Sequence, residues 1–556
     1  MSEQELKLHV PASATAAIRR ELGQRQSSRI RLRALYFDTP ERELVHARIA
    51  LRLRQEGRQW VQTVKMPGAN AITRIELNHP RPGPVLDLSL YAGTEVGDAL
   101  ARIQGELGVR YETDVSRQLC KLRSRYGTVE VALDTGLLRA GALELPISEI
   151  EFELVSGRPE AIFAVGRQWQ KRHGLVLDVR SKSERGDALA EMAQTLANLP
   201  DGDEAEAARK EAVSRFWAPR GARSVKLRPE QDAVQALTTI AGECLEQIVR
   251  NAAALAEVDT AGVYAAGSPE HVHQLRVGMR RLRSAWKLFE GWVAPPAATL
   301  DAGIREYFGA FGASRDQDVL ADTVVPLLER AGMPPIPAEP VARGADAHAL
   351  AASPAFQAWL LELFEWSMNI APPPPAAESE ASQPAAADGA APSASVPADD
   401  EHGASERIVP TIIRLNAGST EAEAPAAPAL SRLLAKRLRR WHKSVAKDGL
   451  RFSELDLESR HELRKRGKRL RYSLSFAESL LPATRLRTYR KQLAHVQELL
   501  GEINDLAVAA EHYRTQTDAH PQAWFALGWI AARLETLVAQ AQPSFDALAH
   551  AKPFWK

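Results

Sequence analysis

The sequence contains few cysteines and no long apolar run. Its two cysteines, Cys120 and Cys244, are too few for a disulfide framework or a zinc cluster, which makes a reducing cytoplasm the expected location. No stretch approaches the ~18 apolar residues that a membrane span requires. No charged segment followed by an apolar one stands at the N-terminus, so we expect no targeting segment and no membrane partner.

The sequence also has no excess charge of either sign, since its formal net charge is +1. That average by itself indicates neither a polyanionic nor a polycationic partner. With 45% apolar and 25% charged residues, the 556-residue chain has the composition of a globular protein of several domains. The charge is nevertheless strongly patterned along the chain, and this patterning carries the functional signal.

Residues 1–200 have a mixed, strand-rich pattern that predicts the first domain. Short helices are expected at Ala12–Leu22, Thr94–Leu107 and Pro159–His173. Alternating segments separated by glycine and proline predict strands. Besides the opening strand at Glu3–Val10, these are Arg31–Phe37, Ile49–Arg54, Trp60–Lys65, Thr73–Asn78, Leu119–Tyr126, Thr128–Leu133 and Ile147–Val155.

Several of these strands carry charged side chains on one face and apolar side chains on the other. Because successive strand residues point to opposite faces, the carboxylates of Glu3 and Glu5 share a face. The same spacing groups Arg52 with Arg54, and it aligns three carboxylates in the segment Glu149–Glu153. A closed antiparallel barrel satisfies both faces, with apolar residues packed outward under helices and charged residues lining the inside.

An interior that mixes carboxylates with guanidinium groups predicts a site for metal ions and a polyanion, because such a lining is costly when empty. The charged residues occur in recognisable motifs, namely Glu3-x-Glu5-x-Lys7, Tyr36-Phe37-Asp38-Thr39, Leu51-Arg52-Leu53-Arg54, Thr63-Val64-Lys65, Arg74-x-Glu76, Thr113-Asp114-x-x-Arg117, Ala132-Leu133-Asp134-x-Gly136, Glu149-x-Glu151-x-Glu153 and Ser181-Lys182-x-x-Arg185-Gly186. In order and spacing, this set resembles the CYTH family of triphosphate tunnel metalloenzymes. Asn78 departs from the family, whose strand often carries another glutamate there.

This resemblance implies a metal-dependent triphosphatase and a role for each charged residue. The residues expected to bind the phosphates, most of them also catalytic, are Lys7, Arg52, Arg54, Lys65, Arg74, Arg117 and Lys182. Hard oxygen ligands suit Mg²⁺ or Mn²⁺. The expected metal ligands are Glu3, Glu5, Glu149 and Glu151, to which the resemblance adds Glu76, Asp134 and Glu153.

Beyond a linker at 201–224, residues 225–556 show the pattern of long amphipathic helices. A Pro/Ala/Ser/Glu-rich stretch at about 371–429 interrupts them, and it lacks the apolar periodicity of a packed core, which predicts a disordered insertion. The helices on either side contain an internal repeat, in which His273–Arg283 aligns with His461–Arg471. At ~100° per residue, the side chains of His273, Arg276, Arg280, Arg283 and Lys287 fall within an arc of about 80°. The same holds for His461, Arg464, Lys468 and Arg471. Two such all-basic faces predict a shared anion.

The repeat also resembles the CHAD family, a helical domain that often follows CYTH. This resemblance implies two pseudo-symmetric four-helix bundles around a basic channel that binds inorganic polyphosphate. The expected polyphosphate-binding residues are His273, Arg276, Arg280, Arg281, Arg283, Lys287, Arg315, His461, Arg464, Lys465, Lys468, Arg469 and Arg471. The fold class predicted for the whole chain is therefore α+β, with a tunnel barrel followed by an all-α domain.

Three functional classes remain open on the sequence. The favoured one is a triphosphatase that converts inorganic triphosphate to diphosphate and phosphate. The second is an adenylate cyclase or a nucleoside or thiamine triphosphatase on the same fold. The third is a non-enzymatic polyphosphate-binding protein. Specific nucleic-acid binding is not expected, because the basic faces lack interleaved aromatic residues for stacking on bases.

Overall fold

The computed structural model describes residues 2–68, 72–199, 203–259, 267–336, 346–373, 429–551 and 554–555. Within these ranges, the side chains of residues 2, 203–205, 214–215 and 313–319 are not described. The predicted insertion at 371–429 lies almost entirely outside the described residues. No helix in the described ranges is long and apolar enough to cross a bilayer.

The N-terminal part forms an antiparallel barrel, as the alternating charged strands predict. Strand order is β5-β4-β3-β2-β6-β7-β8-β1-β9, and an additional pairing of β5 with β1 closes eight of these strands. The strands are β1 (Ser2–His9), β2 (Ser28–Asp38), β3 (Ala50–Glu56), β4 (Gln59–Pro67), β5 (Thr73–Arg81), β6 (Gly108–Ser124), β7 (Gly127–Ala140), β8 (Leu143–Gly157) and β9 (Val176–Leu177).

Where β1 pairs with β8, strand register places the charged residues inside the barrel and the apolar residues outside. Glu5 lies opposite Glu153, and Lys7 lies opposite Glu151. On the other face of the same two strands, Leu6 and Phe152 are buried in the main apolar core. Burial of one face fixes the register, because a shift by one residue would exchange the two faces.

Two sequence predictions in this part differ from the structure. The helix expected at 94–107 is only α3 (Glu95–Leu100), because the amides of Gln104 and Gly105 donate to the Glu43 carboxylate, at 2.9 and 2.8 Å, instead of to helix carbonyls. The strand expected at 119–126 is the longer β6, which pairs with β2 on one side and β7 on the other.

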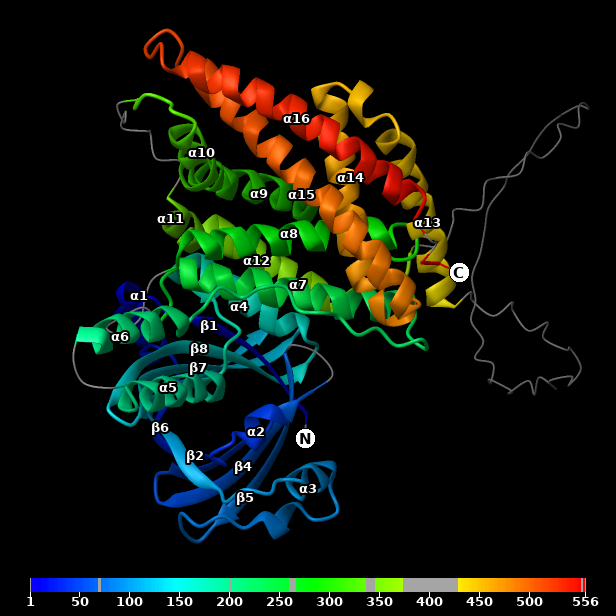
Figure 1. The fold of residues 1–556 in the computed structure, drawn as a ribbon. Helices are drawn as coiled ribbons and strands as arrows, with labels where there is room; N and C mark the ends of the chain where they lie inside the picture. The colour runs from blue at the N-terminus through cyan, green and yellow to red at the C-terminus, as the bar shows by residue number, and fades with distance from the viewer. Residues whose placement is uncertain are drawn as a thin grey trace, which may run out of the picture.

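Helices surround the barrel and close one side of its interior (Figure 1). They are α1 (Ala12–Gly23), α2 (Glu43–His46), α3, α4 (Glu160–His173), α5 (Lys182–Ala197) and α6 (Asp203–Arg215). Helix α5 packs Leu189 against Leu138 and Ile147 in a separate small core. Leu138 and Ile147 lie an even number of residues from Asp134 and Glu149, so α5 covers the face that carries these carboxylates.

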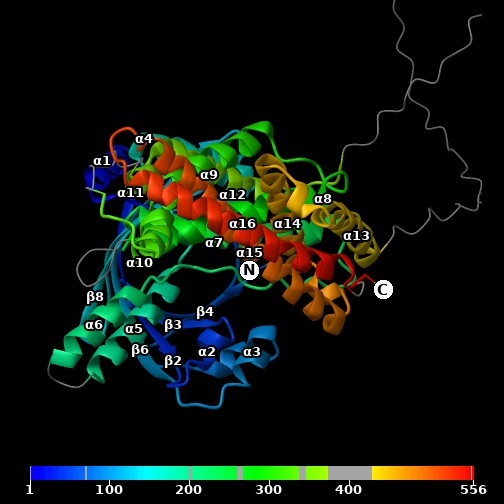
Figure 2. The same cartoon turned by 45° about the horizontal axis from the view of Figure 1, so that its top comes forward.

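The C-terminal part is helical, as predicted, with four long helices on each side of the undescribed segment 374–428. The first set contains α7 (Ala233–Leu255), α8 (Pro269–Phe289), α9 (Ala298–Val319) and α12 (Pro354–Met368), with the short α10 (Val325–Arg330) and α11 (Ala347–Ala352). The second set contains α13 (Leu430–Gly449), α14 (Leu457–Phe476), α15 (Ala483–Arg514) and α16 (Ala523–Ala549). The repeat helices α8 and α14 are in contact (Figures 1 and 2).

One continuous apolar core joins the barrel to the helices. It extends from Leu6 and Phe152 on the outer barrel face, through Phe163 of α4, to Phe364 of α12 and Leu245 of α7. The rings of Phe163 and Phe364 lie 6.2 Å apart between centroids. Figure 2 likewise places α7 on the side of the helical part that faces the barrel. The two parts are therefore packed together through buried side chains.

Candidate active site and anion-binding surface

Three carboxylates meet inside the barrel, at the centre of β7 and β8. Asp134 of β7 lies directly opposite Glu149 of β8 in the strand pairing, and Glu151 follows two residues later on the same face. Among the described residues, these are the three metal-ligating side chains whose oxygens lie within 4.8 Å of one another. We call Asp134, Glu149 and Glu151 the carboxylate trio.

The ammonium group of Lys182 lies in the middle of this trio. Its Nζ is 2.7 Å from an oxygen of Asp134, 2.5 Å from one of Glu149 and 2.8 Å from one of Glu151. Lys182 is the first residue of α5, whose start is fixed by the Ser181 hydroxyl accepting the Glu184 amide at 3.1 Å. The position surrounded by the three carboxylates is thus occupied by a cation of the protein itself.

Arg117 and Lys7 complete this part of the site. Arg117 donates from Nε and Nη2 to the two oxygens of Asp134, both at 2.7 Å, and from Nη2 to Glu151 at 2.5 Å. Lys7 donates from Nζ to the carbonyl oxygen of Arg180 and lies 3.7 Å from Glu149. Both cations therefore face the carboxylate trio from strands on either side of it.

These pairings shift the pKa values of the groups involved. Burial raises the pKa of Glu151, but the charges of Lys182 and Arg117 outweigh it and hold that pKa well below its usual range. Burial lowers the pKa of Lys182, but Asp134, Glu149 and Glu151 hold it well above its usual range. Glu151 is therefore ionised, and Lys182 is protonated, at neutral pH.

A second cluster lies where β1, β4 and β5 meet. Lys65 forms an ion pair with Glu76 and lies 3.7 Å from Glu3, and Arg52 lies 3.6 Å from Glu76. Burial and the hydrogen bond with Glu76 raise the pKa of Glu3 to about 7. Burial by itself would raise the pKa of Glu76, but the charges of Lys65 and Arg52 outweigh it and lower that pKa to about 2. At neutral pH this pair of carboxylates carries less than its full negative charge.

The other predicted residues of the barrel occupy different positions. Arg54 pairs with Glu56, and its pKa is lowered by burial and by the neighbouring charge of Arg52. Arg74 donates to the carbonyl oxygen of Thr73 at 3.0 Å. Glu5 and Glu153 lie side by side in the strand pairing, outside the trio. For Glu153, burial and the charges of Glu130 and Glu5 raise the pKa.

Sequence reasoning assigned no role to Arg185, which the structure places against the trio. Its Nη1 donates to Oε2 of Glu149 at 2.8 Å, and its side chain is 3% exposed. The available signal was helical spacing, because Arg185 stands three residues after Lys182 and so lies on the same side of α5. Tyr36, whose hydroxyl accepts from Arg52 at 3.3 Å, is a second side chain that was not assigned.

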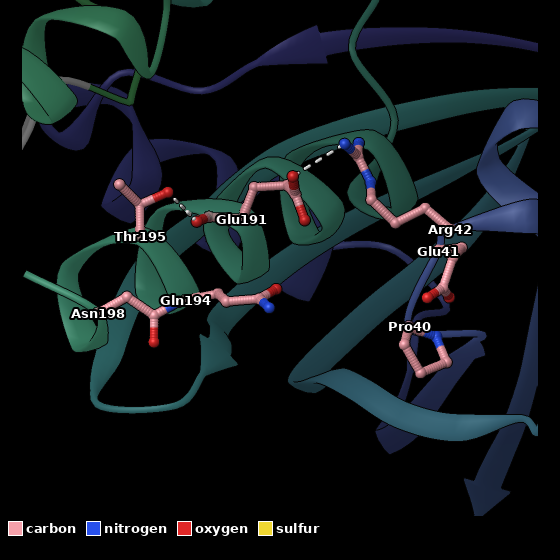
Figure 3. Close-up of a pocket in the computed structure, with 7 residues that line it drawn as sticks. All are labelled: Pro40, Glu41, Arg42, Glu191, Gln194, Thr195 and Asn198. Atoms are coloured by element: carbon pink, nitrogen blue, oxygen red, sulfur yellow. Dashed lines mark hydrogen bonds and ion pairs between the residues drawn. The ribbon is translucent and has the colours of Figure 1, made fainter.

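A surface pocket of about 400 Å³ lies outside this site (Figure 3). It is lined by Pro40, Glu41, Arg42, Glu191, Gln194, Thr195 and Asn198. Arg42 already pairs with Glu191 at 2.9 Å and with Asp187. None of the predicted site residues lines this pocket, and two of its charged side chains, Arg42 and Glu191, pair with each other.

In the helical part, the two basic stripes of the repeat converge. Lys468 of α14 lies among Arg464 and Arg471 of its own helix and Arg280 of α8, with Asp505 as the nearby acid. Burial, followed by the charges of these three arginines, lowers the pKa of Lys468 to about 6. The ring of Phe308 lies beneath the stripe, 4.5 Å from the guanidinium carbon of Arg276 and 5.6 Å from that of Arg280.

Some predicted members of the stripes lie elsewhere. Arg281 is 2% exposed and donates to Gln247 at 2.7 Å, so it points into the core between α7 and α8. Lys287 and Lys465 are exposed; Lys287 pairs with Glu290 just after α8, and Lys465 pairs with Glu462 on α14. Arg283 and Arg469 are close enough for their charges to repel. His273 is half-buried, His461 is exposed, and the side chain of Arg315 lies outside the described residues.

Comparison with known proteins identifies the two parts of the chain. The CYTH domain model matches residues 1–186, and the CHAD domain model matches residues 239–514. An inorganic triphosphatase of Haemophilus influenzae is 30% identical over 162 residues, a match that covers 28% of this chain and 44% of that protein. The chain therefore matches less than half the length of this relative.

Two solved structures resemble the two parts. The CHAD domain of Ricinus communis is 28% identical, with 60% of this chain and 97% of that chain covered and a TM-score of 0.42. A Hippeastrum protein named as an adenylyl cyclase and described as having a dominant triphosphatase activity is 19% identical, covering 34% of this chain and 95% of that one, with a TM-score of 0.26. By its two family matches, the chain consists of a CYTH domain followed by a CHAD domain.

Proposed function

We propose that the CYTH domain hydrolyses inorganic triphosphate to diphosphate and phosphate with the help of a divalent cation. The observation that carries this proposal is the carboxylate trio, which faces Arg117 of β6 and Lys182 of α5 inside one barrel. Phosphoryl transfer needs cations that neutralise the phosphate oxygens and an electrostatic environment that stabilises the transition state. The relative named as an inorganic triphosphatase supports the choice of substrate.

The carboxylate trio fits Mg²⁺ or Mn²⁺ in its chemistry. Its donors are carboxylate oxygens within 4.8 Å of one another, the kind of ligand that these hard cations prefer. Lys182 already places a positive charge among them, so the position is electrostatically suited to a cation. When bound, the divalent ion would polarise a phosphoryl oxygen and neutralise charge that develops during hydrolysis.

The cations of the site would exchange partners when substrate binds. Lys182 and Arg117 form ion pairs with the trio. When the trio binds a divalent ion, both cations would become available to bind the phosphate oxygens. Arg52 and Arg54 repel one another, and a polyanion between them relieves that repulsion. Arginine suits bidentate contact with phosphate oxygens, so these residues both bind and orient the substrate.

The test is phosphate release from inorganic triphosphate, ATP and thiamine triphosphate, each with Mg²⁺, with Mn²⁺ and with a chelator. Inorganic triphosphate with metal should give the fastest release, and chelator should abolish it. Glu151→Gln should lower turnover by about 100-fold or more while the protein stays folded. Glu112→Gln, at a half-exposed position on β6, is the matched control and should keep full activity. Release that is unaffected by chelator would refute the metal-dependent mechanism.

For the CHAD domain, we propose binding of inorganic polyphosphate along the converging basic stripes. Lys468, Arg280 and Arg464 come from both repeat helices and stand close enough to lower the pKa of the lysine, an arrangement that a polyanion would stabilise. A linear polyanion releases condensed counterions when lysine and arginine replace them, so the affinity should fall steeply as salt rises.

This second proposal is tested on the full-length protein with long-chain polyphosphate at increasing salt. Replacing Arg276, Arg280, Arg464 and Lys468 together with Ala should weaken binding and flatten its salt dependence. Replacing the exposed Lys287 and Lys465, which pair with Glu290 and Glu462, should have little effect. Single-stranded DNA that binds as tightly as polyphosphate would instead indicate a general polyanion-binding surface.

A further inference from the structure

A carboxylate of the CHAD domain reaches the active-site barrel. Asp259 follows α7, and its Oδ1 accepts from Nη2 of Arg185 at 2.7 Å. Both side chains are almost fully buried, at 2% and 3% exposure. Asp259 also lies 3.7 Å from Arg180, a second buried arginine of the CYTH domain. This contact is therefore a desolvated ion pair across the boundary between the two domains.

Arg185 connects Asp259 to the carboxylate trio. Its Nη1 donates at 2.8 Å to Oε2 of Glu149, while Oε1 of the same glutamate contacts Lys182 at 2.5 Å. Nη2 also donates to the carbonyl oxygen of Pro146 at 2.8 Å. One guanidinium group thus holds Glu149 on one side and Asp259 on the other, and it leaves Oε1 of Glu149 directed at the cation position.

The position of Asp259 has a conformational cost. Its φ angle is 61°, in the left-handed region that non-glycine residues rarely adopt, and Glu257, two residues earlier, has a φ of 59°. Such conformations persist where surrounding contacts determine them, and they occur often at functional sites. Here the contacts that hold Asp259 are the two buried arginines, Arg180 and Arg185.

Loss of the Asp259 charge would disturb the trio through Arg185. A buried guanidinium that loses one of two carboxylate partners carries an excess of positive charge, since breaking one side of a buried pair leaves the other side uncompensated. That charge would then act more strongly on Glu149 and would repel a divalent cation bound beside it. Outer residues that orient a ligand typically change metal affinity by roughly 10- to 100-fold when replaced.

We propose that Asp259 is a positioning residue through which the CHAD domain completes the metal site of the CYTH domain, by holding Arg185 against Glu149. The inference rests on the metal site of the proposed function. The cations that contact Glu149 belong to the CYTH domain, but the carboxylate that holds Arg185 from its other side belongs to the CHAD domain. The CHAD domain would therefore contribute to the chemistry of the barrel independently of any ligand on its own basic stripes.

The experiment measures Mn²⁺ binding to the full-length protein by electron paramagnetic resonance, without substrate. We expect Asp259→Asn to raise the Kd for Mn²⁺ roughly tenfold, with a normal circular dichroism spectrum. The matched control is Glu365→Gln. Glu365 is also a CHAD-domain carboxylate that pairs with a CYTH-domain arginine, Arg167, but its partner lies on α4, away from the trio. The control should bind Mn²⁺ as the wild type does.

A double-mutant cycle tests whether Asp259 acts through Arg185. Arg185→Lys keeps the positive charge but cannot hold both carboxylates in the same geometry, and it should also weaken Mn²⁺ binding. If Asp259 acts through Arg185, the double variant should bind no more weakly than Arg185→Lys alone. Independent effects, in which the two Kd ratios multiply, would overturn the proposal.

The other possible results of the Mn²⁺ measurements also test the positioning role of Asp259. An unchanged Kd in a folded Asp259→Asn variant, or an equal loss in Glu365→Gln, would overturn the positioning role. Asp259→Ser is the second neutral variant if the Asn variant fails to fold, and the same criteria apply to it. A wild-type protein that binds no Mn²⁺ would refute the proposed metal site itself, which distinguishes that failure from a failure of the Asp259 inference.

Discussion

At the scale of single residues, the barrel holds carboxylates in two different protonation states. Glu149 and Glu151 face several cations and are ionised, whereas Glu3 shares a hydrogen bond with Glu76 and its pKa is raised to about 7. Two acids in contact cannot both ionise without mutual repulsion, so one of them keeps its proton. The difference arises from the number of cations that contact each acid.

The raised pKa of Glu3 predicts a pH dependence of stability. An ordinary glutamate in the unfolded chain releases its proton near pH 4.5, whereas folded Glu3 keeps it up to about pH 7. The folded state therefore binds the extra proton between these values, and this group makes the protein less stable as pH rises through that window. Glu3→Gln should reduce this decline in the free energy of unfolding, measured by urea titration in chelator.

The exposed Glu41→Gln serves as the control and should reproduce the wild-type pH dependence. A Glu3→Gln variant with an undiminished decline from pH 4.5 to 7 would show that Glu3 does not hold the proton.

The lowered pKa of Lys468, in the helical part, predicts that polyphosphate binding takes up a proton. With its pKa lowered to about 6, the lysine is mostly neutral at pH 7.5 in the free protein. A bound polyanion favours the charged form, so polyphosphate binding should take up protons at this pH and should weaken as pH rises above 6. Calorimetry in buffers of different ionisation enthalpy measures this uptake directly.

Lys468→Met should remove most of the proton uptake, whereas Lys465→Met, at an exposed position on the same helix, should leave it unchanged. Equal uptake in wild type and Lys468→Met would assign the titration to another group.

At the scale of elements, the placement of α5 decides where Lys182 lies. Gly186 lets this helix approach the barrel closely, since a Cβ there would lie 2.2 Å from the ring of Tyr111. The Tyr111 ring is itself stacked on Tyr36, with centroids 4.7 Å apart, and is buried. Neither ring can move aside easily, so the close approach depends on the absence of a side chain at residue 186.

Gly186→Ala should therefore displace α5 and, with it, Lys182. We expect a loss of roughly 1–3 kcal/mol in the free energy of unfolding, typical of overpacking. If the proposed function is correct, phosphate release from inorganic triphosphate should also slow. Gly242→Ala in α7 is the matched control, because a Cβ there meets no atom within 4 Å. In that helix the same change should be neutral or should stabilise the protein by up to ~1 kcal/mol. Equal stability of the two variants would contradict the tight contact of α5.

At the scale of the whole molecule, the apolar core crosses the domain boundary. Phe163 of the CYTH domain and Phe364 of the CHAD domain belong to the same buried cluster, which also contains Leu6 and Leu245. Buried charge pairs accompany it, including the one between Arg185 and Asp259. An interface built of core residues couples the folding of the parts that it joins.

Thermal unfolding should accordingly proceed in a single calorimetric transition for both domains. Phe163→Ala should lower its midpoint, with a cost of about 3–5 kcal/mol for the lost aromatic ring. Near-ultraviolet circular dichroism and helix content should then change together. Two separate transitions in the wild-type protein would show that the domains unfold independently despite their shared core.

Local periodicity in the sequence determined which residues line the barrel and which form the basic stripes. The two-residue period of a strand places Glu149 and Glu151 on one face, and the helical period places Arg276 and Arg280 on one side of α8. These predictions needed only the geometry of a single element. Arg281 was assigned to the polyphosphate-binding set from the family motif and not from its angular position. That position directs its side chain into the core, where it donates to Gln247.

Only the tertiary structure decided which charges meet. Lys182 lies among three carboxylates because α5 docks on the barrel, and Lys468 lies beside Arg280 because α8 contacts α14. The pairing of Asp259 with Arg185 joins residues 74 positions apart, on opposite sides of a domain boundary. Patterns within one element carry no information about such contacts. Contacts between charged residues of different elements depend on how all the buried surfaces of the protein pack together. The same packing determines which charged groups lose their contact with water.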